Sequence, residues 1–193
     1  YSLVGPSGSG KSTLLNLLSL IDTPTAGSIE ILKNKVNFKE KTKNDRIRSE
    51  KIGIIYQDKN LLSDFTALEN VYLPMLLLTN DKYKSIIEAK KMIKKVGLSS
   101  RLNHYPSELS GGENQRIAIS RALINQPEII LADEPTGNLD FNNAKQIFKM
   151  IFNLKNNNRI IIFATHNRYF ANMADCKIQM INGKIKLTNA RID

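Results

Sequence analysis

A glycine-rich segment near the start of the chain has the composition of a phosphate-binding loop. The phosphate loop, residues 5–13, reads GPSGSGKST and matches the spacing G-x-x-x-x-G-K-[ST]. An apolar run precedes it and a helical apolar pattern follows it, so its backbone N–H groups and the helix N-terminus can hold polyphosphate. We expect Lys11 to reach the terminal phosphates and Ser12 to bind magnesium. The predicted nucleotide-binding residues are Gly5, Pro6, Ser7, Gly8, Ser9, Gly10, Lys11, Ser12 and Thr13.

Two adjacent acids, Asp133 and Glu134, follow the uninterrupted apolar run Ile129–Ala132. Such a run is typical of a central parallel strand, and carboxylates at its end can hold a divalent cation and polarise a water. Beside a phosphate loop, we expect Asp133 to hold magnesium through water and Glu134 to orient or deprotonate the attacking water. The alternative is an acid pair that only caps the next turn.

Two further polar side chains follow buried strands. Gln57 comes after the predicted strand 52–56, and His166 comes after the predicted strand 159–164. Because open α/β sheets bind ligands at the carboxyl ends of their strands, both are expected at the same edge as Asp133. Gln57 is a candidate metal or water contact, with an ordinary loop residue as the alternative. For His166 the alternative is a satisfied structural histidine.

A second glycine-rich turn, Ser110-Gly111-Gly112, opens a predicted helix over 110–125. Its N–H groups resemble a second anion cradle, although such a turn alone is a weak signal. Because the chain already has one phosphate loop, the simplest interpretation is that this Ser-Gly-Gly turn serves the nucleotide of a different subunit.

The remaining elements position these groups. Two short antiparallel strands are expected at 28–32 and near 36–38, and a short exposed helix over 39–51. Residues 61–97 read as helical, with a capping box from Thr66 to Glu69. Their apolar stripes indicate core; the alternative is that part of 61–74 forms a groove for a partner helix. An amphipathic helix over 141–157 and a hairpin over 178–187, turning at Asn182-Gly183, complete the pattern.

The composition narrows the class of protein to which the chain can belong. With 193 residues, 41% hydrophobic and 24% charged, the chain fits one globular domain. The net charge of +10 comes from scattered lysines without interleaved aromatic residues, which indicates a solvated basic surface and no specific nucleic acid partner. A single cysteine excludes an internal disulfide framework and fits the reducing cytosol. No apolar run approaches the roughly 20 residues of a membrane span.

These motifs, in this order, resemble those of the ATP-binding cassette (ABC) transporter ATPases over essentially the whole chain. The resemblance implies an α/β P-loop NTPase fold in one domain, 1–193. A RecA-like core would comprise 1–57 and 127–193, and an inserted α-helical subdomain 58–126. The family's first strands and its adenine-stacking aromatic residue are expected upstream of Tyr1.

The same resemblance implies the working unit and the site residues. Two ATPase subunits pair head to tail as a homodimer, and ATP with Mg²⁺ lies between the phosphate loop of one and the Ser-Gly-Gly turn of the other. His166 would contact the γ-phosphate. The implied catalytic residues are Glu134, His166, Gln57 and Lys11; the metal ligands are Ser12, Gln57 and Asp133; the residues acting in trans are Ser110, Gly111, Gly112 and Asp140.

A finer resemblance concerns residues 56–71 and 132–140, which look like the ATP-binding subunits of bacterial lipoprotein-releasing systems. It implies a peripheral protein on the cytoplasmic face of the inner membrane, with integral membrane subunits docking near Asp58–Pro74. Cell-division ATPases that regulate peptidoglycan hydrolysis and macrolide or peptide exporters are the alternatives. A cassette acting on DNA or ribosomes fits the charge, but it is disfavoured because this chain has neither a coiled-coil insertion nor a tandem second cassette. Glu113 stands where the family more often has glutamine.

Overall fold

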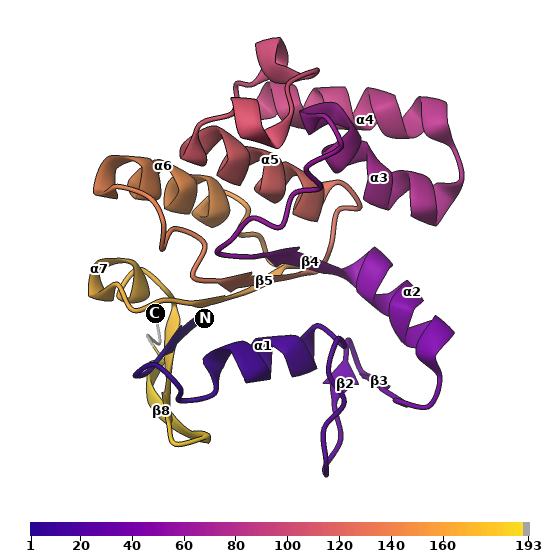
Figure 1. Cartoon of the computed structure of the whole chain (residues 1–193). Helices are drawn as coiled ribbons and strands as arrows, with labels where there is room; N and C mark the ends of the chain where they lie inside the picture. The colour runs from indigo at the N-terminus through magenta and orange to yellow at the C-terminus, as the bar shows by residue number, and fades with distance from the viewer. Residues whose placement is uncertain (191–193) are drawn as a thin grey trace.

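A six-stranded sheet forms the centre of the computed structural model, which describes residues 1–190 (Figure 1). The strand order is β4-β5-β6-β1-β7-β8, in which β8 alone runs antiparallel to its neighbour. The apolar runs predicted as strands form the parallel part because parallel strands are covered on both faces. The bounds are β1 (Ser2–Val4), β4 (Ile52–Ile55), β5 (Ile129–Asp133), β6 (Ile160–Ala164), β7 (Cys176–Ile181) and β8 (Lys184–Ala190).

Helices cover both faces of this sheet (Figure 1). On one face lies α1 (Lys11–Leu18), where Leu15 packs with Leu3 of β1 and Leu131 of β5. On the other lie α5 (Gly111–Leu123) and α6 (Phe141–Phe152), packed on Ile130 and Ala132. Successive residues of β5 therefore fill opposite cores, as the alternation of side chains along a strand requires.

A third apolar cluster joins α5 to two further helices, α3 (Ala67–Thr79) and α4 (Lys82–Lys95). Thr66 caps α3 through the predicted capping box: its hydroxyl accepts from the N–H of Glu69, whose carboxylate accepts from the N–H of Thr66. Two short 3₁₀ turns, η1 (Ser99–Arg101) and η2 (Pro106–Glu108), lead to α5. The division of the chain into a core (1–57 and 127–193) and a helical subdomain (58–126) stays a prediction. Residues 191–193 of the predicted core lie outside the described residues.

Several predicted bounds differ from those observed. The helical stretch expected over 61–97 begins at Ala67 and breaks at Asn80, whose left-handed φ of 54° ends α3. The helix expected to reach residue 157 ends at Phe152, and a short α7 (Arg168–Ala171) after the Asn167 cap was not predicted. The antiparallel pair is shorter than expected, β2 (Glu30–Ile31) with β3 (Asn34–Lys35), and its second strand precedes the predicted position near 36–38. Helix α2 (Lys41–Lys51) forms within the predicted segment 39–51.

The predicted type I′ turn is confirmed between β7 and β8. Asn182 and Gly183 have φ values of 48° and 73°, the left-handed pair that this turn needs. Within residues 1–190, no helix combines the length and the apolar character that crossing a bilayer requires.

Phe148→Ala is expected to lower the free energy of unfolding by about 3–5 kcal/mol, because it leaves a cavity in a buried aromatic cluster. Phe148 is 1% exposed and stacks on Phe170 with ring centroids 3.9 Å apart. Urea unfolding of the two proteins measures the difference. Phe141→Ala removes the same side chain from the same helix at a position 54% exposed, so its cost should be clearly smaller. Equal losses would contradict the assignment of Phe148 to the core.

Candidate active site

A cavity of about 500 Å³ lies at the carboxyl ends of the parallel strands. The loops after β1, β4, β5 and β6 all reach it, although they are separated by up to 160 residues of chain. The sheet therefore brings the phosphate loop together with all four polar residues expected at this edge. The lining residues are Gly5, Ser7, Gly8, Gly10, Lys11, Ser12, Thr13, Gln57, Asp133, Glu134 and His166.

The phosphate loop is held tightly under this cavity. A Cβ on Gly5 would lie 2.3 Å from the carbonyl oxygen of Met180 in β7, so only glycine fits there. Gly10 has a left-handed φ of 97° and immediately precedes α1. The Lys11 Nζ donates to the carbonyls of Gly5 and Pro6, both at 3.0 Å, so its ammonium lies within the curve of the loop.

Two of the predicted nucleotide-binding residues do not line the cavity. Pro6 is exposed beside it, and Ser9 is 3% exposed and directed into the protein. The carbonyl of Ser9 accepts from the N–H of Gly183, at 3.1 Å, so the β7–β8 turn is hydrogen-bonded to the phosphate loop.

Glu134 is fixed by its backbone and by His166. Its φ of 44° is left-handed, an uncommon conformation for a residue with a side chain and one that clusters at functional sites. Its N–H donates to the carbonyl of Ala164 at 3.1 Å, and its Oε2 lies 3.0 Å from Nδ1 of His166. The Glu134 side chain is 16% exposed and that of His166 73%, so the pair spans the cavity wall and its mouth.

Gln57 joins the cavity to the loop after β5. Its Nε2 donates to Oδ1 of Asn138 at 3.3 Å, and Nδ2 of Asn138 donates to Oδ1 of Asp58 at 3.2 Å. A Cβ on Gly137 would lie 2.8 Å from the Gln57 amide, so glycine there permits the contact. Sequence reasoning did not predict the contact of Asn138 with Asp58, because it joins positions 80 residues apart.

The Ser-Gly-Gly turn does not line this cavity. It lies against the start of α6 in the same chain: a Cβ on Gly111 would be 3.6 Å from Leu139, and one on Gly112 would be 3.3 Å from Asn143. Asp140 caps α6, accepting from the N–H groups of Asn142 and Asn143 at 3.0 and 3.1 Å. The backbone N–H of Asn143, followed by its side-chain amide, lowers the pKa of Asp140.

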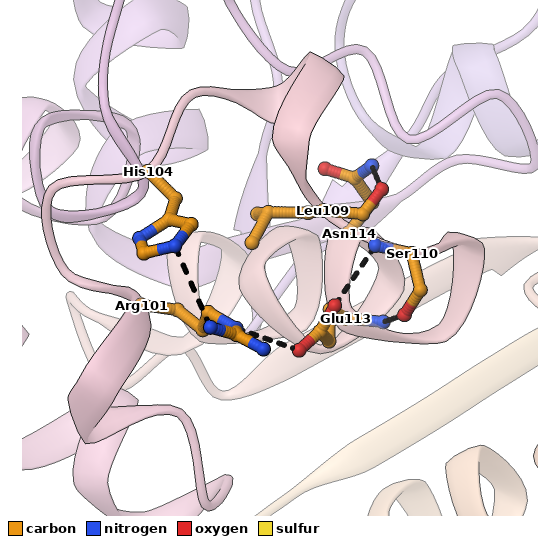
Figure 2. A network of polar contacts seen from close by, with 6 residues as sticks. All are labelled: Arg101, His104, Leu109, Ser110, Glu113 and Asn114. Atoms are coloured by element: carbon orange, nitrogen blue, oxygen red, sulfur yellow. Dashed lines mark hydrogen bonds and ion pairs between the residues drawn. The ribbon is translucent and has the colours of Figure 1, made fainter.

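A capping box that the sequence reasoning missed fixes the Ser-Gly-Gly turn (Figure 2). Ser110 Oγ accepts from the N–H of Glu113 at 3.3 Å, and Glu113 Oε2 accepts from the N–H of Ser110 at 2.8 Å. The S-x-x-E spacing signals this arrangement and could have found it. The N–H of Ser110, then the Arg101 guanidinium, lowers the pKa of Glu113 from 4.5 to about 2.

The low pKa of Glu113 predicts a pH-dependent contribution to stability. A depressed carboxyl pKa stabilises the fold above the unfolded value of 4.5, and this contribution is lost as pH falls toward about 2. The difference in unfolding free energy between the wild type and Glu113→Gln should therefore be largest above about pH 5 and shrink as the solution is acidified. Urea unfolding from neutral to acidic pH measures it. A pH-independent difference would contradict the charged cap.

The comparisons with known proteins agree with this geometry. The family model described as ABC transporter matches residues 1–137. The chain therefore belongs to the ABC transporter family and is an ATPase cassette of the α/β P-loop type, which confirms the fold class expected from the motifs.

Among curated relatives, the lipoprotein-releasing system ATP-binding protein LolD 1 of Chlorobium luteolum is 44% identical, over 96% of this chain and 82% of its own length. LolD of Shewanella frigidimarina is 40% identical, over 98% and 80%. Among solved structures, the ATP-binding cassette MJ0796 matches in a dimeric structure and in a dimeric post-hydrolysis state bound to ADP and Pi. Each has a TM-score of 0.90 and 36% identity, and covers 98% of this chain and 84% of its own.

Proposed function

We propose that this chain binds ATP with Mg²⁺ in the cavity at the sheet edge and hydrolyses it. The observation that carries the proposal is the convergence of the phosphate loop with Gln57, Asp133, Glu134 and His166 around one cavity. Lys11 and the loop N–H groups hold the phosphates. The post-hydrolysis structure of a similar cassette with ADP and Pi supports the same use of the fold.

Magnesium is assigned to Ser12, Gln57 and Asp133. A hydroxyl, an amide oxygen and a carboxylate around one cavity are the hard oxygen donors that Mg²⁺ prefers, with water completing the set. No group of three His, Cys, Asp or Glu side chains within residues 1–190 offers a competing metal site. When bound, Mg²⁺ neutralises charge on the phosphate oxygens.

Glu134 is assigned as the general base and His166 as its partner. Glu134 accepts a proton from the attacking water, the new bond forms at the γ-phosphorus, and the bond to the β–γ bridging oxygen breaks. His166, 3.0 Å from that carboxylate and exposed at the cavity mouth, holds Glu134 in place and contacts the γ-phosphate.

Each site needs two chains in this proposal, because the Ser-Gly-Gly turn lies outside the cavity of its own chain. Ser110, Gly111, Gly112 and Asp140 would act on the nucleotide of a second copy in a head-to-tail homodimer. The dimeric state of two similar cassettes supports this pairing.

The coupled process is proposed to be release of lipoproteins from the bacterial inner membrane, on whose cytoplasmic face the protein would lie. The support is the identity of 40–44% with proteins named LolD. Membrane subunits would dock near Asp58–Pro74. A groove of about 360 Å³ among α2, β4, α3 and α5 supports that position, since Asn60 and Pro74 of this segment line it.

Reconstitution tests the proposal. The chain and the membrane proteins that co-purify with it are placed in proteoliposomes that carry a triacylated lipoprotein. We expect ATP to release the lipoprotein into the medium, and Glu134→Gln to abolish the release. ATP hydrolysis without release would overturn the lipoprotein assignment and leave the ATPase assignment standing. Co-purification of division-site proteins would favour the cell-division alternative.

A further inference from the structure

A polar network connects the segment before α5 with the Ser-Gly-Gly turn (Figure 2). We propose that Arg101, acting through Glu113, is a positioning residue that holds the Ser-Gly-Gly turn in the geometry needed by the nucleotide of the second copy. This inference rests on the proposed function, and it assigns a role in hydrolysis to a side chain that lies outside the nucleotide cavity.

Glu113 uses its two carboxylate oxygens for two different purposes. Oε2 accepts from the N–H of Ser110 at 2.8 Å, and Oε1 accepts from Nε of Arg101 at 3.0 Å. One carboxylate therefore bridges the turn and the guanidinium. The Glu113 side chain is 17% exposed and that of Arg101 41%, and hydrogen bonds between ionised groups are stronger than those between neutral ones. The pKa of Glu113, lowered from 4.5 to about 2, keeps the bridge charged well into the acidic range.

The segment that carries Arg101 is held in position by its backbone. Nη1 of Arg101 lies 3.5 Å from Nε2 of His104, and its Nε is directed at Glu113 (Figure 2). The neighbouring carbonyls of Leu102 and His104 accept from the N–H groups of Leu68 and Ala67, at 3.0 and 2.8 Å. These two N–H groups belong to the first turn of α3 and would otherwise lack partners.

The network consequently joins the start of α3 to the Ser-Gly-Gly turn. The start of α3 lies within the segment Asp58–Pro74 that we assign to membrane docking. A shift of that segment would move residues 102–104, and with them Arg101 and Glu113. On the other side of the turn, the Asn114 side chain donates to the carbonyls of Pro106 and Leu109, so the turn is constrained from both directions.

The test compares four forms of the full chain: wild type, Arg101→Met, Glu113→Gln and the double variant. Glu113→Gln keeps an oxygen for the capping box but offers Arg101 a donor in place of an acceptor. Lys91→Met is the matched control, because Lys91 pairs with Glu88 at 2.7 Å on α4, remote from the turn. Steady-state phosphate release gives kcat and KM, and light scattering gives ATP-driven dimerisation in a Glu134→Gln background.

Arg101→Met and Glu113→Gln are each expected to lower kcat about 10-fold and to weaken ATP-driven dimerisation by a similar factor. ATP affinity of the monomer stays unchanged, because its own phosphate loop is untouched. The double variant is expected to be no worse than either single variant, since both remove one interaction.

Three results separate the possibilities. Unchanged kcat and dimerisation in Arg101→Met, with an active wild type, would overturn the positioning role alone. Losses that add in the double variant, or that follow only a lowered melting temperature, would reduce the pair to a structural ion pair and overturn it as well. An inactive wild type would instead contradict the proposed function.

Discussion

Glu134→Gln is expected to lower the rate of ATP turnover by about 100-fold or more, because it removes a positioned general base. The amide keeps the size of the side chain but cannot accept the proton of the attacking water. The backbone hydrogen bond of residue 134 to Ala164 does not depend on the side chain, so the loop keeps its shape. Phosphate release at saturating ATP measures the effect.

ATP affinity separates this role from simple binding. If Glu134 acts as the base, Glu134→Gln binds ATP as tightly as the wild type while turnover falls. Glu30→Gln, a change of the same chemistry at an exposed position on β2, should leave both quantities unchanged. A turnover that survives Glu134→Gln would remove Glu134 from the catalytic role and return the acid pair to the capping alternative.

Lys11→Met is expected to weaken ATP binding by about 10- to 100-fold, because it removes a cation that makes charged hydrogen bonds to the phosphates. The Nζ atom also donates to the carbonyls of Gly5 and Pro6, so the curve of the loop loses two contacts. Titration with a fluorescent ATP analogue measures the dissociation constant.

Lys35→Met supplies the matched control, since Lys35 is an exposed lysine on β3 with no contact to the cavity. It lowers the net charge by the same amount. Equal weakening of ATP binding by the two substitutions would show that Lys11 acts only through the overall positive charge. Binding that persists in Lys11→Met at wild-type strength would contradict the phosphate assignment.

Local chemistry made much of this molecule predictable. The apolar run at Ile129–Ala132 forms a buried strand because its side chains have no polar group to keep in water. Asn182-Gly183 forms the type I′ turn because asparagine and glycine tolerate the positive φ values that this turn needs. Helix ends were less predictable, because residues 153–157 include no glycine or proline to mark where α6 stops after Phe152. The short α7 was missed because four residues carry no helical period.

The sequence by itself determined the chemistry of the candidate site, because the phosphate loop and the residues that follow each strand can be recognised from spacing alone. It also predicted that the groups after the strands share one edge of the sheet. Only the tertiary structure decided which side chains touch there. The parallel sheet places Gln57, Asp133 and His166 around one cavity, and it leaves the Ser-Gly-Gly turn outside. Contacts such as Gln57 with Asn138, or Arg101 with Glu113, depend on side-chain reach across packed elements. The spacing of residues along the chain does not predict those distances.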